Sequence, residues 1–359
     1  MPRPKMGESH KLSLAIHFFS WKMIPAERFL AALRREETDR VSFVETSIGL
    51  GIARRLLGRE LSLVDIPQLG LKLLNVEDEK ALSRLLHRDN ISVRLVAPTF
   101  SQRPIGKGGQ PFAGDGLIKD MDDFRDKFSL PDPEDDSLYE SVRQFVQEKE
   151  EFAVICSTRL GYLSTLISIG LQTYMEAVYT NPALIDAVTG AYVDWSAKVL
   201  RKVCDMGVDA VKTTDDFAFD TAPFMSPTMF RQWVVPYHER AYREISVPWI
   251  LHTDGNIMPI LEDLLAMGIT GIHPIDPNCM DIRAFKRDYG HRVCVLGNVN
   301  VNTLCMGTPE ETYAEVRDLI RDLGPGFGYV VSSGNSVPDY AKPANLMALA
   351  RAMEDFGNY

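Results

Sequence analysis

Short hydrophobic runs recur along the chain, with helix-like stretches between them. Eight of these runs lack the polar alternation of a sheet that has one face in water, which is typical of buried parallel strands. Eight strands separated by helices predict a TIM (β/α)8 barrel, and an open doubly wound sheet is the alternative. The predicted strands span residues 41–45, 90–96, 152–157, 209–214, 248–253, 270–275, 292–297 and 328–333.

Several of the intervening helices have recognisable ends. Asn181-Pro182 begins a helix whose apolar positions continue at helical spacing to Gly207. Residues 308–311, Thr-Pro-Glu-Glu, form a capping box with proline at the first helical position, and Gly324 ends that helix. A last helix is predicted from Pro343 to Gly357.

The domain organisation follows from where the strands begin. Residues 1–40 are predicted to form an N-terminal helical arm, and residues 41–359 a single barrel domain. Residues 101–136 are rich in glycine, proline and acidic residues, so we interpret them as an insertion in the barrel. The glycine-rich part, residues 106–116, is expected at the rim of the barrel or at a subunit contact.

Composition narrows the function classes. The 359 residues are 45% hydrophobic and 25% charged, which is typical of a folded globular protein. The formal charge of −10 argues against nucleic-acid binding. No apolar run is long enough to span a bilayer. Five cysteines without a CxxC pair suggest neither disulfides nor a thiolate zinc site, so a cytoplasmic location is expected.

Polar residues after the predicted strands are the candidates for chemistry, because TIM barrels build their active sites at the carboxyl ends of the strands. His252 and Asp254 are two residues apart and would face one cavity, although a histidine bonded to a turn aspartate fits the pattern equally well. Of Asp215 and Asp216, only one can face inward. His273 fits a core position as well as a site position.

Familiar catalytic motifs are absent from the sequence. No GxGxxG follows a strand, and no GxxxxGK[ST], GxSxG or HExxH occurs. The usual nucleotide-binding, serine-hydrolase and zinc-protease signals are therefore missing.

Five segments resemble the uroporphyrinogen decarboxylase superfamily, and the resemblance covers most of the chain from about residue 26. They are residues 27–45, 215–240, 250–277, 295–316 and 345–357. The resemblance implies a TIM barrel that carries one of two chemistries. Members either decarboxylate uroporphyrinogen or, as cobalamin-dependent methyltransferases, move methyl groups between small molecules and a corrinoid protein.

Two departures argue against the decarboxylase branch. Decarboxylases resemble one another in an arginine-rich N-terminal segment and a GHG turn after the last strand. This chain has Glu45 near the first position and Ser333-Gly334-Asn335 at the second. A carboxylate at position 45 would repel a substrate that bears eight carboxylates. Arg54 and Arg55 keep decarboxylation open as an alternative.

The methyltransferase branch fits better. Thiol-methylating members bind zinc through a His-x-Cys pair and a later cysteine, where this chain has His252-Thr253-Asp254 and Ser333. His and carboxylate ligands still suit zinc. The resemblance implies transfer of a methyl group from a small methoxylated or N-methylated donor to the cobalamin of a partner corrinoid protein. A non-catalytic binding barrel is the third alternative, and a homodimer stays open.

The candidate site residues follow from this interpretation. Catalysis is assigned to His252, Asp216 and Asp254, and the same three residues, with Glu45, are the candidate ligands if zinc is bound. The candidate substrate-binding residues are Glu45, Arg159, Tyr162, His273, Asn298 and Asn335.

Overall fold

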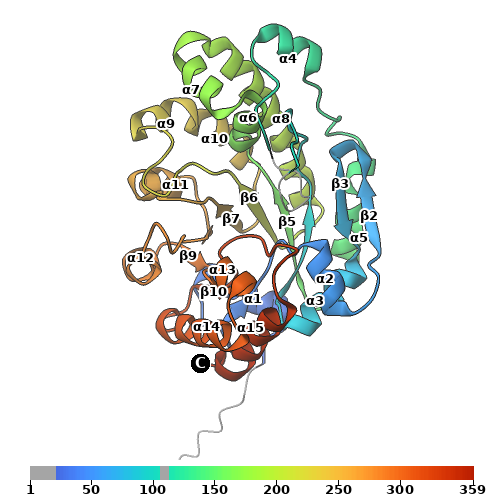
Figure 1. Ribbon diagram of the computed structural model, residues 1–359, viewed down its shortest axis with the longest axis vertical. Helices are drawn as coiled ribbons and strands as arrows, with labels where there is room; N and C mark the ends of the chain where they lie inside the picture. Colours follow the sequence, from blue (N-terminus) through green and yellow to red (C-terminus); the bar gives the residue numbers. More distant parts are fainter. Residues whose placement is uncertain (1–21, 106–112) are drawn as a thin grey trace, which may run out of the picture.

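The computed structural model describes residues 22–105 and 113–359. Within these residues eight parallel strands form one sheet in the order β1-β10-β9-β8-β7-β6-β5-β4 (Figure 1). Each of the eight predicted strands is present. They are β1 (Ser42–Phe43), β4 (Asn90–Arg94), β5 (Ala153–Thr158), β6 (Ala210–Thr214), β7 (Trp249–His252), β8 (Gly271–His273), β9 (Cys294–Leu296) and β10 (Tyr329–Val331).

The two edge strands of this sheet, β1 and β4, come together and close it into a barrel. The backbone N–H of Asp89 donates to the carbonyl of Phe43 at 2.7 Å. The backbone N–H of Glu45 donates to Asn90 Oδ1 at 3.1 Å. The fold is therefore the predicted TIM barrel, and the doubly wound alternative was wrong.

Helices surround the barrel (Figure 1). The predicted helix ends at Pro182, Thr308 and Pro343 are confirmed, and the Thr308–Glu311 capping box is present. No helix in the described ranges is long and apolar enough to cross a membrane. The helices are α1 (Pro25–Arg34), α2 (Leu50–Leu57), α3 (Val76–Leu86), α4 (Met121–Lys127), α5 (Glu140–Gln147), α6 (Tyr162–Ile169), α7 (Leu171–Thr180), α8 (Pro182–Asp205), α9 (Pro227–Trp233), α10 (Val235–Tyr242), α11 (Leu261–Ala266), α12 (Ile282–Tyr289), α13 (Val301–Met306), α14 (Pro309–Leu323) and α15 (Pro343–Phe356), with short 3₁₀ turns η1 (Pro67–Leu69), η2 (Asp136–Tyr139) and η3 (Met258–Ile260).

The first helix, α1, fills the amino-terminal end of the barrel. Its buried side chains Phe29, Ala32 and Leu33 pack in one apolar cluster with residues from the strands. The strand residues in that cluster are Val44, Ala153, Ile155, Ala210, Ile250, Cys294, Leu296 and Val330. The described part of the predicted arm is therefore packed into the barrel, and residues 1–21 of that arm lie outside the described residues.

Two features lie between the barrel strands. An antiparallel hairpin, β2 (Leu63–Ile66) and β3 (Leu71–Leu74), was not predicted. The predicted insertion at 101–136 carries helix α4 and an isolated bridge between Ser101 and Gly116. Residues 106–112, most of the glycine-rich segment expected at the rim, lie outside the described residues.

Candidate active site

The barrel interior changes from apolar to polar along each strand, because alternate residues face the interior. On β5, Ala153 and Ile155 lie in the cluster that α1 fills, whereas Ser157 and Arg159, the next two residues on that side, line a cavity. Strands β6 and β7 repeat the pattern. Ala210 and Ile250 are in the apolar cluster, and Lys212, Thr214, Asp216, His252 and Asp254 line the cavity.

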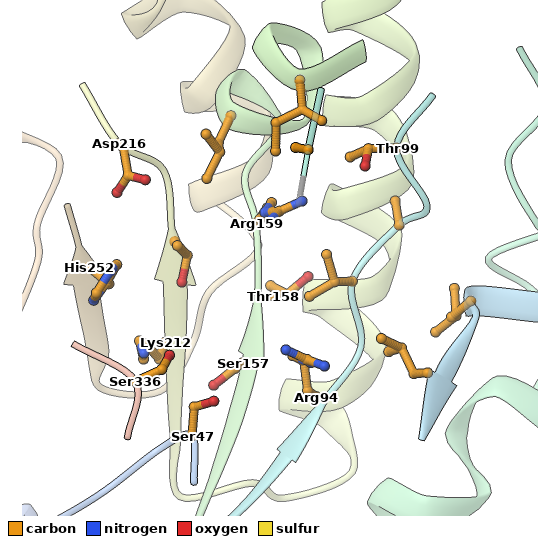
Figure 2. Close-up of a pocket in the computed structure, with 18 of the residues that line it drawn as sticks. Ser47, Arg94, Thr99, Ser157, Thr158, Arg159, Lys212, Asp216, His252 and Ser336 are labelled. Atoms are coloured by element: carbon orange, nitrogen blue, oxygen red, sulfur yellow. The ribbon is translucent and has the colours of Figure 1, made fainter. Parts of the chain in front are cut away.

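The cavity lies at the carboxyl ends of the strands, where a TIM barrel has its active site, and measures about 530 Å³ (Figure 2). Its remaining wall comes from the end of β4, from α6, from residues 69–71 at the start of β3, and from loops. Other lining residues include Thr46, Ser47, Arg94, Val96, Ala97, Arg103, Ala113, Thr158, Leu163, Ile167, Asn335 and Ser336. The volume suits a small organic molecule.

Asp216, His252 and Asp254 come together on one side of this cavity. Their nearest ligand atoms all lie within 4.8 Å of one another. His252 Nε2 lies 3.8 Å from Asp254 Oδ1, too far for a hydrogen bond. Two contacts hold the carboxylates in place. Asn335 Nδ2 donates to Asp254 Oδ2 at 2.8 Å, and the backbone N–H of Asp254 donates to Asp216 Oδ1 at 3.2 Å.

Electrostatics in this cluster favour binding of a cation. Burial and the neighbouring Asp216 carboxylate raise the pKa of Asp254 to about 7. Burial, with smaller effects from Lys212 and His273, lowers the pKa of His252 well below its usual value, so its imidazole is neutral at pH 7. A neutral imidazole beside two carboxylates that repel each other is a donor set that a divalent metal would stabilise.

A buried chain of hydrogen bonds assigns the tautomer of His252. His273 Nε2 lies 2.9 Å from the carbonyl oxygen of Ser333, which can only accept, so this nitrogen carries the proton. Burial lowers the pKa of His273 to about 3, and its Nδ1 is therefore bare. His252 Nδ1, 2.7 Å from His273 Nδ1, must then donate. The lone pair of His252 Nε2 is left on the side of the two carboxylates.

Glu45 does not join the cluster, contrary to its prediction as a metal or substrate ligand. The side chain is buried, and its two oxygens accept from the backbone N–H and the hydroxyl of Ser333 at 2.6 and 2.7 Å. Burial raises the pKa of Glu45 to about 7, against those two hydrogen bonds. Ser333 also bonds His273 through its carbonyl, so Glu45 and His273 contact the same backbone segment.

Two predicted substrate-binding residues are structural instead. Tyr162 is buried between the rings of Tyr174 and Phe217. Asn298 bonds the backbone of Ile275, accepting from its N–H at 3.1 Å and donating to its carbonyl. Neither lines the cavity. Both follow a strand in sequence, and strand-end position alone does not distinguish a core-facing from a cavity-facing side chain.

The two adjacent aspartates do face opposite ways. Asp216 lines the cavity, whereas buried Asp215 accepts from the backbone N–H groups of Leu160 and Leu163 at 2.7 and 2.8 Å. These donors belong to the turn that begins α6. Burial raises the pKa of Asp215 to about 6, and the two backbone hydrogen bonds oppose that rise.

Two cationic residues that line the cavity from the barrel strands were not identified from the sequence. Arg94 ends β4, and Lys212 lies in the middle of β6 with its Nζ donating to Thr46 Oγ1 at 2.7 Å. Burial lowers the pKa of Lys212 to about 8. A charged residue inside an otherwise apolar run was the signal that could have found both.

A polar cavity at the carboxyl ends of barrel strands, with two carboxylates and an imidazole brought together, defines a TIM-barrel enzyme. The profile of the family described as uroporphyrinogen decarboxylase (URO-D) matches residues 104–356. The chain belongs to this family, as its sequence segments predicted. The convergence of candidate groups at one cavity argues against a non-catalytic barrel.

Similar proteins represent both chemistries of the family. A uroporphyrinogen decarboxylase from Shewanella loihica is 21% identical over 64% of this chain and 67% of its own length. A methylated-thiol–coenzyme M methyltransferase from Methanosarcina mazei is 25% identical over 42% of this chain and 40% of its own. The chain spans about half the length of other curated decarboxylases that it matches.

The barrel also matches a solved structure. A methyltransferase from Methanosarcina mazei superimposes with a TM-score of 0.71 at 19% identity, covering 93% of this chain and 99% of that one. At this identity the similarity establishes the common fold.

Proposed function

We propose that the protein is a methyltransferase that moves a methyl group from a small methoxylated or N-methylated molecule to the cobalamin of a corrinoid protein. The observation that carries this proposal is the cluster of Asp216, His252 and Asp254 at the cavity wall. The similarity in sequence to a methylated-thiol–coenzyme M methyltransferase, and in fold to a methyltransferase, supports it.

The cluster fits a metal ion, and zinc suits its donors best. Zinc at catalytic sites takes three protein ligands of the nitrogen and oxygen type and keeps one position open. His252 Nε2 is neutral, faces the carboxylates and has no hydrogen bond within the described ranges. Asp216, His252 and Asp254 would hold the ion, and the cavity would supply the open position.

In the proposed reaction, these residues would stabilise the oxygen that leaves the methyl group. When a methyl ether is cleaved, the methyl–oxygen bond breaks with its electron pair left on oxygen, and the carbon bonds to the acceptor. A bound zinc supplies a Lewis acid for that oxygen, and the corrinoid supplies the methyl acceptor. The protein's residues orient the donor so that its oxygen faces the cluster and its methyl group faces the open mouth.

Decarboxylation of uroporphyrinogen is the second candidate, and a specific observation favours it. Four cationic side chains, Arg94, Arg103, Arg159 and Lys212, line the cavity and would attract carboxylates. Asp216 and Asp254 lie on the side opposite Arg94 and Arg159, with Lys212 near them, and their carboxylates would repel the substrate's. The cavity therefore carries both signs of charge instead of being uniformly cationic.

The deciding experiment combines metal analysis with two activity assays on the purified protein. Methyl donors are screened with reduced cobalamin, either free or bound to a corrinoid protein. Decarboxylation of uroporphyrinogen is assayed separately. We expect zinc in the protein, methyl transfer from at least one donor, and loss of both in Asp216→Asn. Asp288→Asn on the surface of α12 is the matched control. Decarboxylation that is unaffected by chelation would overturn the proposal.

A further inference from the structure

Arg94 and Arg159 are two arginines that reach the cavity without an anionic partner. Arg94 ends β4, and Arg159 follows β5 directly. Neither guanidinium makes a hydrogen bond or an ion pair with any residue in the ranges that the structure describes. Arg94 is exposed at the cavity surface, and desolvation by the atoms around it lowers its pKa with no opposing charge beside it. Burial also lowers the pKa of Arg159, against the more distant charges of Asp215 and Asp216.

The two buried arginines of the described residues, Arg28 and Arg88, are paired. Arg28 donates to Asp39 and to Asp89, each at 2.6 Å. Arg88 donates to Glu79 at 3.0 Å.

Desolvation makes an unpaired guanidinium costly, and this cost applies to half-buried Arg159. Exposed Arg94 keeps its guanidinium at the surface of the same cavity, without a partner among the described residues. The two cavity arginines therefore point to an anion that is supplied from outside the chain.

The strand register places these arginines in the same cavity as the cluster of Asp216, His252 and Asp254, but away from that cluster. Arg94 pairs in register with Ser157, and Ser157 pairs with Lys212. Arg159 is two residues beyond Ser157, so it faces the same side one layer nearer the mouth. His252 lies on the far side of β6, paired with Thr214. Figure 2 shows His252 and Asp216 on one side of the cavity and the arginines on the other.

Apolar side chains complete the arginine side. Val96 and Ala97 continue the chain beyond Arg94, and Leu163 and Ile167 of α6 line the cavity beyond Arg159. A ligand that reaches from the arginines to the cluster would therefore lay an apolar body against this wall. The anionic end and the reacting end of such a ligand would be different parts of one molecule.

We propose that Arg94 and Arg159 form a subsite for a carboxylate, so that the small molecule used by this enzyme is an organic acid with an apolar body. This step rests on the proposed function only for what happens at the other end of the molecule. A guanidinium presents a planar fork of donors that matches a carboxylate with two parallel hydrogen bonds. Lys212 is already bonded to Thr46 and adds positive charge without being a direct partner.

Two kinds of ligand could place a carboxylate at this position: a small organic acid, or a tetrapyrrole that carries several carboxylates. The two ligands differ in the number of partners that they need. A small acid would be bound by the arginines and leave the mouth free, whereas a tetrapyrrole would also need partners for its other carboxylates.

The test compares benzoate with its neutral isostere benzamide. Binding to the full-length protein is measured by calorimetry and ligand-observed NMR at constant ionic strength. We expect at least about tenfold tighter binding of benzoate, since charge-assisted hydrogen bonds distinguish the two probes. Arg94→Gln and Arg159→Gln should each remove most of this preference and leave benzamide unaffected. Arg94→Lys and Arg159→Lys should restore part of it, because the charge remains without the fork.

Two controls make the result decisive. Arg351→Gln on exposed α15 removes the same charge away from the cavity and should leave the preference unchanged. Uroporphyrinogen is the competitor that identifies a tetrapyrrole source, since it would displace benzoate only if it enters this subsite. Equal binding of benzoate and benzamide to the unmodified protein, or an undiminished preference in both glutamine variants, would overturn the subsite.

Failure of the subsite and failure of the proposed function give different results. If benzoate binding depends on the arginines but no methylated donor is turned over, the subsite stands and the methyltransferase proposal fails. If a donor is turned over equally in the glutamine variants and the neutral donor is as good as the acid, the subsite fails and the proposed function stands.

Discussion

His252 and His273 face each other through their Nδ1 atoms, 2.7 Å apart, with both rings buried and stacked. Only one proton fits between the two nitrogens. The carbonyl of Ser333 decides which ring carries it, because it requires the proton of His273 to be on Nε2. Under the proposed function, His273 is thus a positioning residue that would keep the Nε2 lone pair of His252 available to a metal.

Replacing His273 should weaken metal binding without removing a ligand. In His273→Phe, His252 Nδ1 loses its acceptor, and we expect zinc affinity to fall about 10- to 100-fold. His273→Gln offers a carbonyl oxygen to the same N–H and should retain more of the affinity. Competition with a chelator of known affinity measures both variants. Exposed His291→Gln is the control, and unchanged affinity in His273→Phe would show that the pair is only structural.

Substitution of Asp215 should affect stability, whereas substitution of its neighbour Asp216 should affect metal binding. Asp215→Ala leaves two buried backbone N–H groups without acceptors, so it should lower the free energy of unfolding by about 1–3 kcal/mol. Asp216→Ala removes a cavity carboxylate that repels Asp254, so stability should change little while zinc binding is lost. Thermal unfolding and metal content are measured on both. A destabilised Asp216→Ala with normal metal content would reverse the assignment.

Acid should destabilise the fold through His238. Both ring nitrogens of His238 are buried without a hydrogen-bond partner among the described residues, and burial lowers its pKa to about 3. As pH falls from about 6.5 to about 3, His238 is therefore protonated in the unfolded chain but stays neutral in the folded chain. This one group should cost about 1.4 kcal/mol of stability per pH unit across that window.

Denaturant unfolding at several pH values checks the contribution of His238. His238→Phe should reduce the slope of stability against pH below about 6.5 by up to that amount. Other buried histidines titrate in the same window, so the difference from the unmodified protein is the quantity of interest. An identical slope in His238→Phe would mean that the ring is hydrated or paired in solution.

Helix α1, which fills the amino-terminal end of the barrel, should be essential to folding. Leu33 is fully buried in α1 among the inward-facing strand residues, so Leu33→Ala should cost about 2–5 kcal/mol of unfolding free energy. Leu30 on the same helix is only half buried, and Leu30→Ala should cost clearly less. Chemical denaturation compares the two. Equal, small effects would mean that α1 is a detachable arm.

The sequence alone was enough for the barrel, because each strand is a run that can only be buried and each of several helices carries its own end signals. The β2–β3 hairpin escaped prediction since Leu63–Ile66 and Leu71–Leu74 are largely exposed or half buried and interrupted by polar residues such as Asp65 and Lys72. A hydrophobic pattern is informative only where burial imposes it.

The site was predictable only in part. His252 and Asp254 follow the two-residue alternation and do line one cavity, as does Asn335. Glu45 and Asn298 instead accept hydrogen bonds from the backbone N–H groups of Ser333 and Ile275. These are contacts between residues far apart in the sequence, so no local pattern predicts them. Arg94 is the last residue of β4 but lies inside the predicted run 90–96, and Lys212 lies in the middle of β6. Both therefore precede the positions at which polar residues had been sought in the sequence.

The closed amino end of the barrel has a kinetic consequence. Because α1 blocks that end, the cavity in the described structure is reached from the carboxyl side of the strands. Under the proposed function, a small methyl donor and the corrinoid protein that carries the acceptor would share this one entrance and could not pass each other. Under the proposed function the donor enters first and the carrier docks second, and initial-rate measurements should show compulsory-order kinetics with inhibition at high carrier concentration.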